Sequence, residues 1–257
     1  MRDKYGMAAT MAVVVVLALA CRLGLAQIGP RYAVDIGTAP GGPAATTRAA
    51  QGKVELVGKG LALIRYDGID ILTVGADADD YSAAAVHRWP AADLLVVTPA
   101  IAGRYSGVAP LASLHGLHVV LPEAAGATAV PPMPPGRASG VDRGPRFYPM
   151  QTWDSLHLRK GRASLRVTAM PGASGTAQVA GFVLELGNAR ASYRVYLSCA
   201  PLADEELQAL PARLPGADLA LLPVLAQPAP QLLPLRRRQL APTLLTPAGY
   251  AFTAIRR

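Results

Sequence analysis

The sequence predicts a mixed α/β (α+β) sandwich, and two observations lead to this fold class. From Lys53 onward, short apolar runs alternate with turn residues such as Asp67 and Gly68, a pattern that is typical of β-strands. The strand-rich pattern occurs in two halves, and helical segments lie between strands instead of following each strand in turn. This organisation favours a sandwich over a repeating βαβ unit.

The runs predicted to form strands are short and rich in Val, Ile and Leu. They are Lys53–Val57, Leu61–Tyr66, Ile69–Thr73, Asp93–Thr98, His118–Leu121, Ser164–Ala169, Gly181–Leu186, Ser192–Ser198 and Asp218–Pro223. A helix is predicted over Pro201–Leu214, because Asp204, Glu205 and Glu206 near its start complement the helix dipole. A second helix is predicted around Pro234–Leu240.

The N-terminal residues predict export or membrane attachment. Arg2 and Lys4 precede an apolar run from Met7 to Cys21, the pattern of a secretory signal. The run is shorter than the ~20 apolar residues that a membrane span requires. We therefore expect residues 1–26 to be a signal peptide, or an anchor that uses residues 7–26 if it is not cleaved, with lipidation as a further alternative.

The rest of the chain divides into two parts. Residues 27–52 are rich in Ala, Pro and Gly and are predicted to be a flexible linker. Residues 53–257 are predicted to form the folded domain. The apolar N-terminus places this domain in the cell envelope, either in the periplasm or anchored to the inner membrane.

Charge and cysteine content exclude two kinds of site. The formal net charge is +8, but the basic residues are scattered, and the one dense cluster, Arg236 to Arg238, has few aromatic neighbours. This distribution predicts that nucleic acid is not a partner. The two cysteines, Cys21 and Cys199, supply neither a disulfide framework nor a cysteine zinc cluster.

Five blocks of the domain follow one another in an order that is typical of one superfamily. They are Val54–Thr73, Ala92–Thr98, Trp153–Leu156 with Leu165–Pro171, Gly181–Glu185 with Val195–Ser198, and Asp218–Pro223. Together they resemble the metallo-β-lactamase superfamily, closest to its branch of ascorbate-6-phosphate lactonase-like hydrolases. The resemblance covers nearly all of Lys53 to Arg257. It implies a four-layer αββα sandwich, preceded here by the N-terminal apolar segment, and a zinc-dependent hydrolase site.

The resemblance also implies where the metal ligands should lie, and this chain departs from the superfamily there. A His-x-His-x-Asp-His loop, a later histidine, a bridging aspartate and a last histidine bind metal in the superfamily. The corresponding positions carry residues unsuited to zinc: Pro99, Ile101, Gly103, Arg104, Ser174 (or Ala173), Ala200 and Pro247. We therefore predict that the chain holds no metal cofactor, although zinc is expected for the superfamily.

The loops that carry the replaced metal-ligand positions supply candidate binding residues. They would line the cleft that holds the metal in the superfamily, here called the ancestral cleft. These are Arg104, Tyr105, Ser106, Ser174 and Cys199. An arginine in such a cleft can hold a carboxylate or a phosphate through two parallel hydrogen bonds. The four histidines, His87, His115, His118 and His157, are interpreted as structural or exposed rather than as a relocated metal site.

The function predicted from the sequence is that of a pseudoenzyme in the bacterial cell envelope, which binds a small anion or a protein partner. Two alternatives belong to other classes. One is an active hydrolase with a rebuilt or metal-free site around Cys199, Ser174 and Arg104. The other is a structural or assembly protein that its N-terminus tethers to the membrane. Fold resemblance does not distinguish these functions.

Overall fold

The computed structural model describes residues 30–37, 51–75, 78–98, 108–123, 144–172, 178–187, 191–224, 227, 229–236 and 241–256. Residues Arg31–Arg257 form one compact unit. The predicted signal or anchor, residues 1–26, lies outside the described residues. Within the described ranges no helix is long and apolar enough to cross a membrane.

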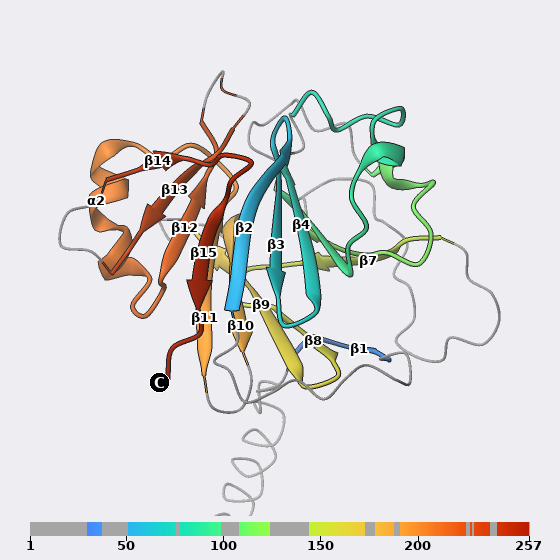
Figure 1. Ribbon diagram of the computed structural model, residues 1–257, viewed down its shortest axis with the longest axis horizontal. Coiled ribbons are helices and arrows are strands. Elements are labelled where there is room, and N and C mark those ends of the chain that lie inside the picture. The colour runs from blue at the N-terminus through green and yellow to red at the C-terminus, as the bar shows by residue number, and fades with distance from the viewer. Residues whose placement is uncertain are drawn as a thin grey trace, which may run out of the picture. The chain divides into compact units, whose positions relative to one another are not determined.

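Two mixed β-sheets make up most of this unit (Figure 1). Sheet A has eight strands in the order β1-β8-β9-β10-β11-β12-β13-β14, and sheet B has seven in the order β15-β2-β3-β4-β5-β6-β7. The strands of sheet A are β1 Tyr32–Ile36, β8 Ser155–Lys160, β9 Ala163–Pro171, β10 Val179–Gly187, β11 Ser192–Ser198, β12 Leu219–Leu222, β13 Gln231–Pro234 and β14 Thr243–Leu244. Those of sheet B are β2 Gln51–Gly58, β3 Leu61–Tyr66, β4 Ile69–Gly75, β5 Leu94–Thr98, β6 His118–Pro122, β7 Arg146–Met150 and β15 Tyr250–Thr253.

The first and last strands cross between the two halves of the chain. β1 pairs in parallel with β8 and so belongs to the sheet formed by the second half. β15 pairs antiparallel with β2 and so returns the C-terminus to the sheet formed by the first half, where Figure 1 shows it beside β2. Both halves of the sequence are therefore needed to complete each sheet.

The main core lies between the two sheets. Alternate residues of each strand face it, as Leu165, Val167 and Ala169 of β9 do, while Ile64 of β3 and Ile71 of β4 reach it from sheet B. All five are at most 1% exposed. Burial of these side chains removes apolar surface from water, which is the dominant favourable contribution to folding.

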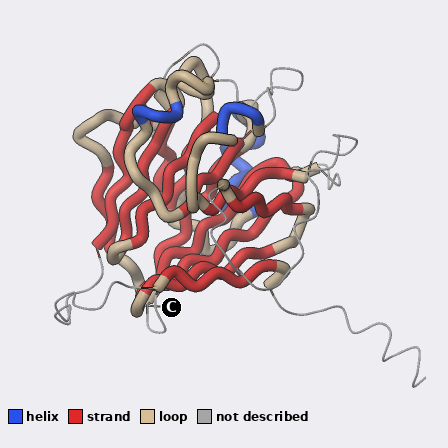
Figure 2. Tube along the Cα trace, turned by 90° about the vertical axis from the view of Figure 1, so that its right-hand side faces the viewer, coloured by secondary structure: helices blue, strands red, loops and turns tan. Residues whose placement is uncertain are grey.

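The outer face of each sheet is also covered, but by different means. On sheet A, Leu210 of helix α2 (Asp204–Arg213) packs with Ala220 and Leu233 of the sheet. On sheet B, a second apolar cluster forms under the segment that contains the short 3₁₀ helix η1 (Val86–Arg88) and under η2 (Ala109–Leu111). Helical segments are short throughout the described chain, as Figure 2 shows.

Most sequence-based elements are confirmed, and two predictions are corrected. All the predicted strands occur, and the helix predicted over Pro201–Leu214 is α2. The prediction of a linker over 27–52 is wrong for Tyr32–Ile36 and for the start of β2, because these residues pair with β8 and with β3 and β15. The helix predicted around Pro234–Leu240 is wrong at its start, where Pro234 ends β13; residues 237–240 lie outside the described residues.

Candidate functional site

The loops that the resemblance assigns to metal binding leave the sandwich at one edge of each sheet, here called the cleft edge. In sheet B, β4 and β5 run parallel and end together at Gly75 and Thr98, so the loop from residue 99 starts there. In sheet A, Met170 near the end of β9 and Ser198 at the end of β11 both pair with Gly181 of β10. The loops after β9 and β11 therefore start side by side.

The segment that carries Pro247 connects the cleft edges of the two sheets. The Leu245 N–H donates to the carbonyl of Pro230, next to the start of β13, over 2.9 Å. The Leu56 N–H, near the end of β2, donates to the carbonyl of Thr246 over 3.2 Å. Pro247 is thus held at the cleft edge, where it is exposed.

Cys199, a candidate from the sequence, lies at the cleft edge but belongs to the core. Its residue is 4% exposed, its N–H donates to the carbonyl of Ala180 over 2.9 Å, and it packs in the cluster between the sheets. Burial raises the pKa of the Cys199 thiol to about 12. Because the thiolate is the nucleophilic form, this environment disfavours a reactive cysteine, and with it a rebuilt site centred on Cys199.

Hydroxyl groups near the same edge are bound to backbone carbonyls. The Ser198 hydroxyl donates to the carbonyl of Ala200 over 2.6 Å, and the Thr98 hydroxyl donates to the carbonyl of Val74 over 3.2 Å. The Tyr196 hydroxyl lies 3.3 Å from the carbonyl of Ala180, and burial raises the pKa of this phenol to about 12. These hydroxyls satisfy local backbone acceptors and stabilise the strand ends.

Two of the mapped ligand positions can be placed, and both lack a side chain that binds metal. Ala200 is exposed just after β11, and Pro247 is exposed on the connecting segment. The other mapped or candidate residues lie outside the described residues: Pro99, Ile101, Gly103, Arg104, Tyr105, Ser106, Ala173 and Ser174. Among the residues that can be placed, no three His, Cys, Asp or Glu side chains form a group that could hold a metal ion.

The histidines are dispersed over the unit. The Nδ1 atom of His118, in β6, lies 2.8 Å from the hydroxyl of Tyr148 in β7, and burial lowers the pKa of His118. His157 is on the outer face of β8, while His87 in η1 and His115 before β6 are exposed. This dispersal agrees with the interpretation of the histidines as structural or exposed.

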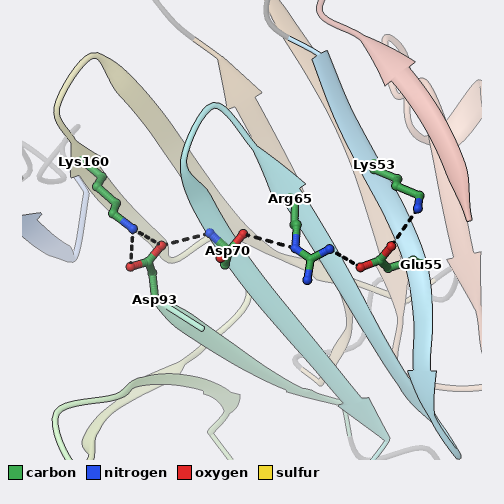
Figure 3. A network of polar contacts seen from close by, with 6 residues as sticks. All are labelled: Lys53, Glu55, Arg65, Asp70, Asp93 and Lys160. Carbon is green, nitrogen blue, oxygen red and sulfur yellow. Dashed lines mark hydrogen bonds and ion pairs between the residues drawn. The ribbon is translucent and has the colours of Figure 1, made fainter. Parts of the chain in front are cut away.

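A network of six charged side chains crosses the outer face of sheet B at the end opposite the cleft edge, here called the turn edge (Figure 3). Its members, in spatial order, are Lys53, Glu55, Arg65, Asp70, Asp93 and Lys160. Glu55 contacts Lys53 at 2.8 Å and is also paired with Arg65, whose Nε lies 3.8 Å from Asp70. Lys160 comes from sheet A, so the network joins both sheets.

Electrostatics within this network are balanced. Three cations face three carboxylates, and Asp93 accepts both from Lys160 Nζ, at 2.8 Å to each oxygen, and from the Asp70 N–H at 2.9 Å. The hydrogen bond from Lys53 and the charge of Arg65 lower the pKa of Glu55, whereas burial and the neighbouring Asp93 raise the pKa of Asp70. Such mutual pairing indicates a structural clamp, and sequence reasoning did not find it.

When the chain is compared with known proteins, it matches solved structures. No family model and no curated protein matches the sequence. The chain is similar to the metallo-β-lactamase fold protein YhfI from Bacillus subtilis, with 8% identity, coverage of 67% of this chain and 70% of that one, and a TM-score of 0.36. It is also similar to a B3 metallo-β-lactamase with an active-site glutamic acid, with 16% identity, coverage of 68% and 76%, and a TM-score of 0.37.

Proposed function

We propose that this chain is a non-catalytic protein of the bacterial cell envelope, with a metallo-β-lactamase-like αββα sandwich, that binds a small anion or a protein partner. The observation that carries the proposal is the replacement of every mapped metal ligand. The two positions that can be placed, Ala200 and Pro247, are exposed at the cleft edge and offer no metal-binding atom in their side chains. A hydrolytic zinc site needs three or four such ligands at one point.

The surroundings of the cleft edge support binding over catalysis. Cys199 is buried with a raised pKa, and the nearby hydroxyls of Ser198 and Thr98 bond backbone carbonyls. These groups are therefore not poised as nucleophiles. A four-layer arrangement is supported by the apolar clusters on the outer face of each sheet, and the envelope location by the apolar run from Met7 to Cys21.

The test is the metal content of the full chain. The protein is expressed with its N-terminal segment, extracted in detergent and purified without a metal-chelating step. Zinc, manganese and iron are then measured by elemental mass spectrometry, with an intact zinc hydrolase of the superfamily treated in parallel as the control. We expect well below one equivalent of metal, and no hydrolysis of β-lactam or lactone substrates when zinc is added. One or two tightly held equivalents, or zinc-dependent turnover, would refute the proposal.

A further inference from the structure

The polarity of the outer face of sheet A changes along its strands. Toward the cleft edge it is apolar, and α2 covers Tyr196 and Val183 there. Toward the turn edge the outward-facing residues of β8 and β9 are polar, and α2 does not pack on them. The side chains His157, Arg159, Ser164 and Arg166 therefore line an open groove of about 320 Å³, with Glu185 at its side. This volume is in the range of small-molecule sites.

Strand register places the groove residues at defined distances. His157 pairs with Arg166, and Arg159 pairs with Ser164, across the β8–β9 hairpin. Residues that face one another on adjacent strands have Cβ atoms ~5 Å apart, and diagonal neighbours are separated by roughly 7–8 Å. The two guanidinium groups therefore stand on a diagonal from which their long side chains can converge on one anion.

The two groove arginines lie opposite carboxylates on neighbouring strands, Arg159 opposite Asp35 and Arg166 opposite Glu185. Glu185 pairs with Arg194, at 3.0 Å, and Asp218 is paired with Arg236. Neither Arg159 nor Arg166 forms an ion pair with a carboxylate among the residues that the structure describes. The guanidinium donors of these two arginines are therefore not taken up by a carboxylate among these residues.

His157 supplies a further unsatisfied group. Its Nε2 atom is shielded from solvent and has no hydrogen-bond partner within the described part of the chain. Burial and the adjacent Arg166 lower the pKa of His157, which favours the neutral ring. A shielded ring nitrogen without a partner is unfavourable.

We propose that this groove binds a phosphate group, with Arg159 and Arg166 as the charged contacts and His157 beside them. Phosphate is favoured because arginine binds its oxygens through parallel N–H donors, and the two guanidinium groups can converge on one phosphate. The site lies at the turn edge, so it is separate from the ancestral cleft and does not depend on what that cleft binds. The phosphate can belong to a soluble metabolite or to a lipid headgroup.

The test compares three matched variants of the full chain in detergent, each of which loses one exposed arginine of the same hairpin. R159Q and R166Q remove groove residues, while R162Q removes a charge at the hairpin turn, outside the groove. Binding of inorganic phosphate is measured by calorimetry at constant ionic strength, because exposed charges are screened by salt. We expect saturable binding that weakens at least tenfold in R159Q and R166Q, since each variant loses charged hydrogen bonds to the anion, and less than twofold in R162Q.

A second arm identifies the source of the phosphate. Flotation with phosphatidylcholine vesicles, with and without phosphatidic acid, is compared between the wild-type chain and R166Q. Recovery that depends on phosphatidic acid and on Arg166 would assign the groove to a lipid headgroup, and phosphate binding without this dependence would assign it to a soluble ligand. Thermal melts of each variant check folding. The proposal is overturned if phosphate does not bind, or if R162Q weakens binding as much as the groove variants do.

Discussion

Replacement of Lys160 by methionine tests whether the network on sheet B stabilises the fold by joining the sheets. Lys160 Nζ lies 2.8 Å from both oxygens of Asp93, and the two side chains are 28% and 15% exposed. Without the ammonium group, Asp93 keeps the Asp70 N–H as a donor but loses its cation and lies beside a second carboxylate. Methionine preserves most of the apolar stem of lysine, so the substitution measures the contribution of the charge to stability.

The exposure of this pair sets the expected magnitude. Exposed ion pairs contribute ~0.2–1 kcal/mol, whereas removal of one partner of a fully buried pair destabilises by roughly 3–5 kcal/mol. Because Asp93 is mostly buried and Lys160 only in part, we expect Lys160→Met to lower the free energy of unfolding by about 1–2 kcal/mol. In a chain of this size that corresponds to a decrease in Tm of roughly 2–8 °C.

The assay is urea unfolding of the full chain followed by circular dichroism, with Lys59→Met as the matched control. Lys59 lies 3.5 Å from Asp79, and these side chains are 65% and 80% exposed, so loss of this pair should change stability by less than about 0.5 kcal/mol. A double-mutant cycle with Asp93→Asn should give a coupling of about 1 kcal/mol. Equal effects of Lys160→Met and Lys59→Met would refute the idea that the network is a clamp between the sheets.

Three other substitutions or treatments probe the core and the cleft edge. Gly52→Ala should destabilise by about 1–3 kcal/mol in the same urea assay, because its added Cβ would lie 2.1 Å from the ring of Phe252; an unchanged midpoint would contradict this packing. Burial lowers the pKa of His118, so the unfolded chain takes up the proton first and wild-type stability should fall as the pH drops below about 6.5. Thermal melts of His118→Gln between pH 8 and pH 5 should show a smaller loss, and identical losses would exclude this histidine as the cause. Because the pKa of Cys199 is raised to about 12, iodoacetamide at pH 8 should modify it at least tenfold more slowly in the native chain than in urea, as measured by peptide mass spectrometry; equal rates would show that the thiol is accessible.

Elements with a strong local pattern could be predicted from the sequence. Leu61–Tyr66 and Ser192–Ser198 have the same limits in the structure as in the prediction, because apolar residues and flanking turn residues define them locally. β1 was missed since its five residues lie in a segment rich in Ala, Pro and Gly, and its partner β8 is more than a hundred residues away. β7 was missed because Pro149 argues against a strand; Pro is tolerated there because β7 is the edge of sheet B.

Pro234–Leu240 shows how tertiary pairing overrides a local pattern. Leucines at 232, 233 and 235 are compatible with either a helix or a strand, since short apolar runs do not distinguish the two. Pairing with β12 fixes residues 231–234 as a strand, and the bond from the Leu235 N–H to the carbonyl of Asp218 extends this arrangement. No signal in the sequence alone indicates that Asp218 will lie there.

In the candidate sites too, features that depend on local sequence could be predicted, and features that depend on long-range pairing could not. The resemblance to the superfamily was enough to predict which loops carry the mapped ligand positions, and β4 and β5 end together at the cleft edge because they are parallel. The network on sheet B and the groove on sheet A were not predicted, because each depends on side chains that pair across strands. Lys160 and Asp93, for example, are 67 residues apart in the sequence.

The two turn-edge faces differ in one respect that bears on function. On sheet B every cation of the network has a carboxylate, so the charges there stabilise the fold without a ligand. On sheet A, Arg159 and Arg166 face Asp35 and Glu185 across neighbouring strands, but neither guanidinium forms an ion pair within the described residues. Ion pairing therefore accounts for the first arrangement, whereas the second leaves guanidinium donors for the proposed anion. It follows that a phosphate should raise the Tm of the wild-type chain more than that of R166Q, because a ligand that binds only the folded state stabilises it by mass action.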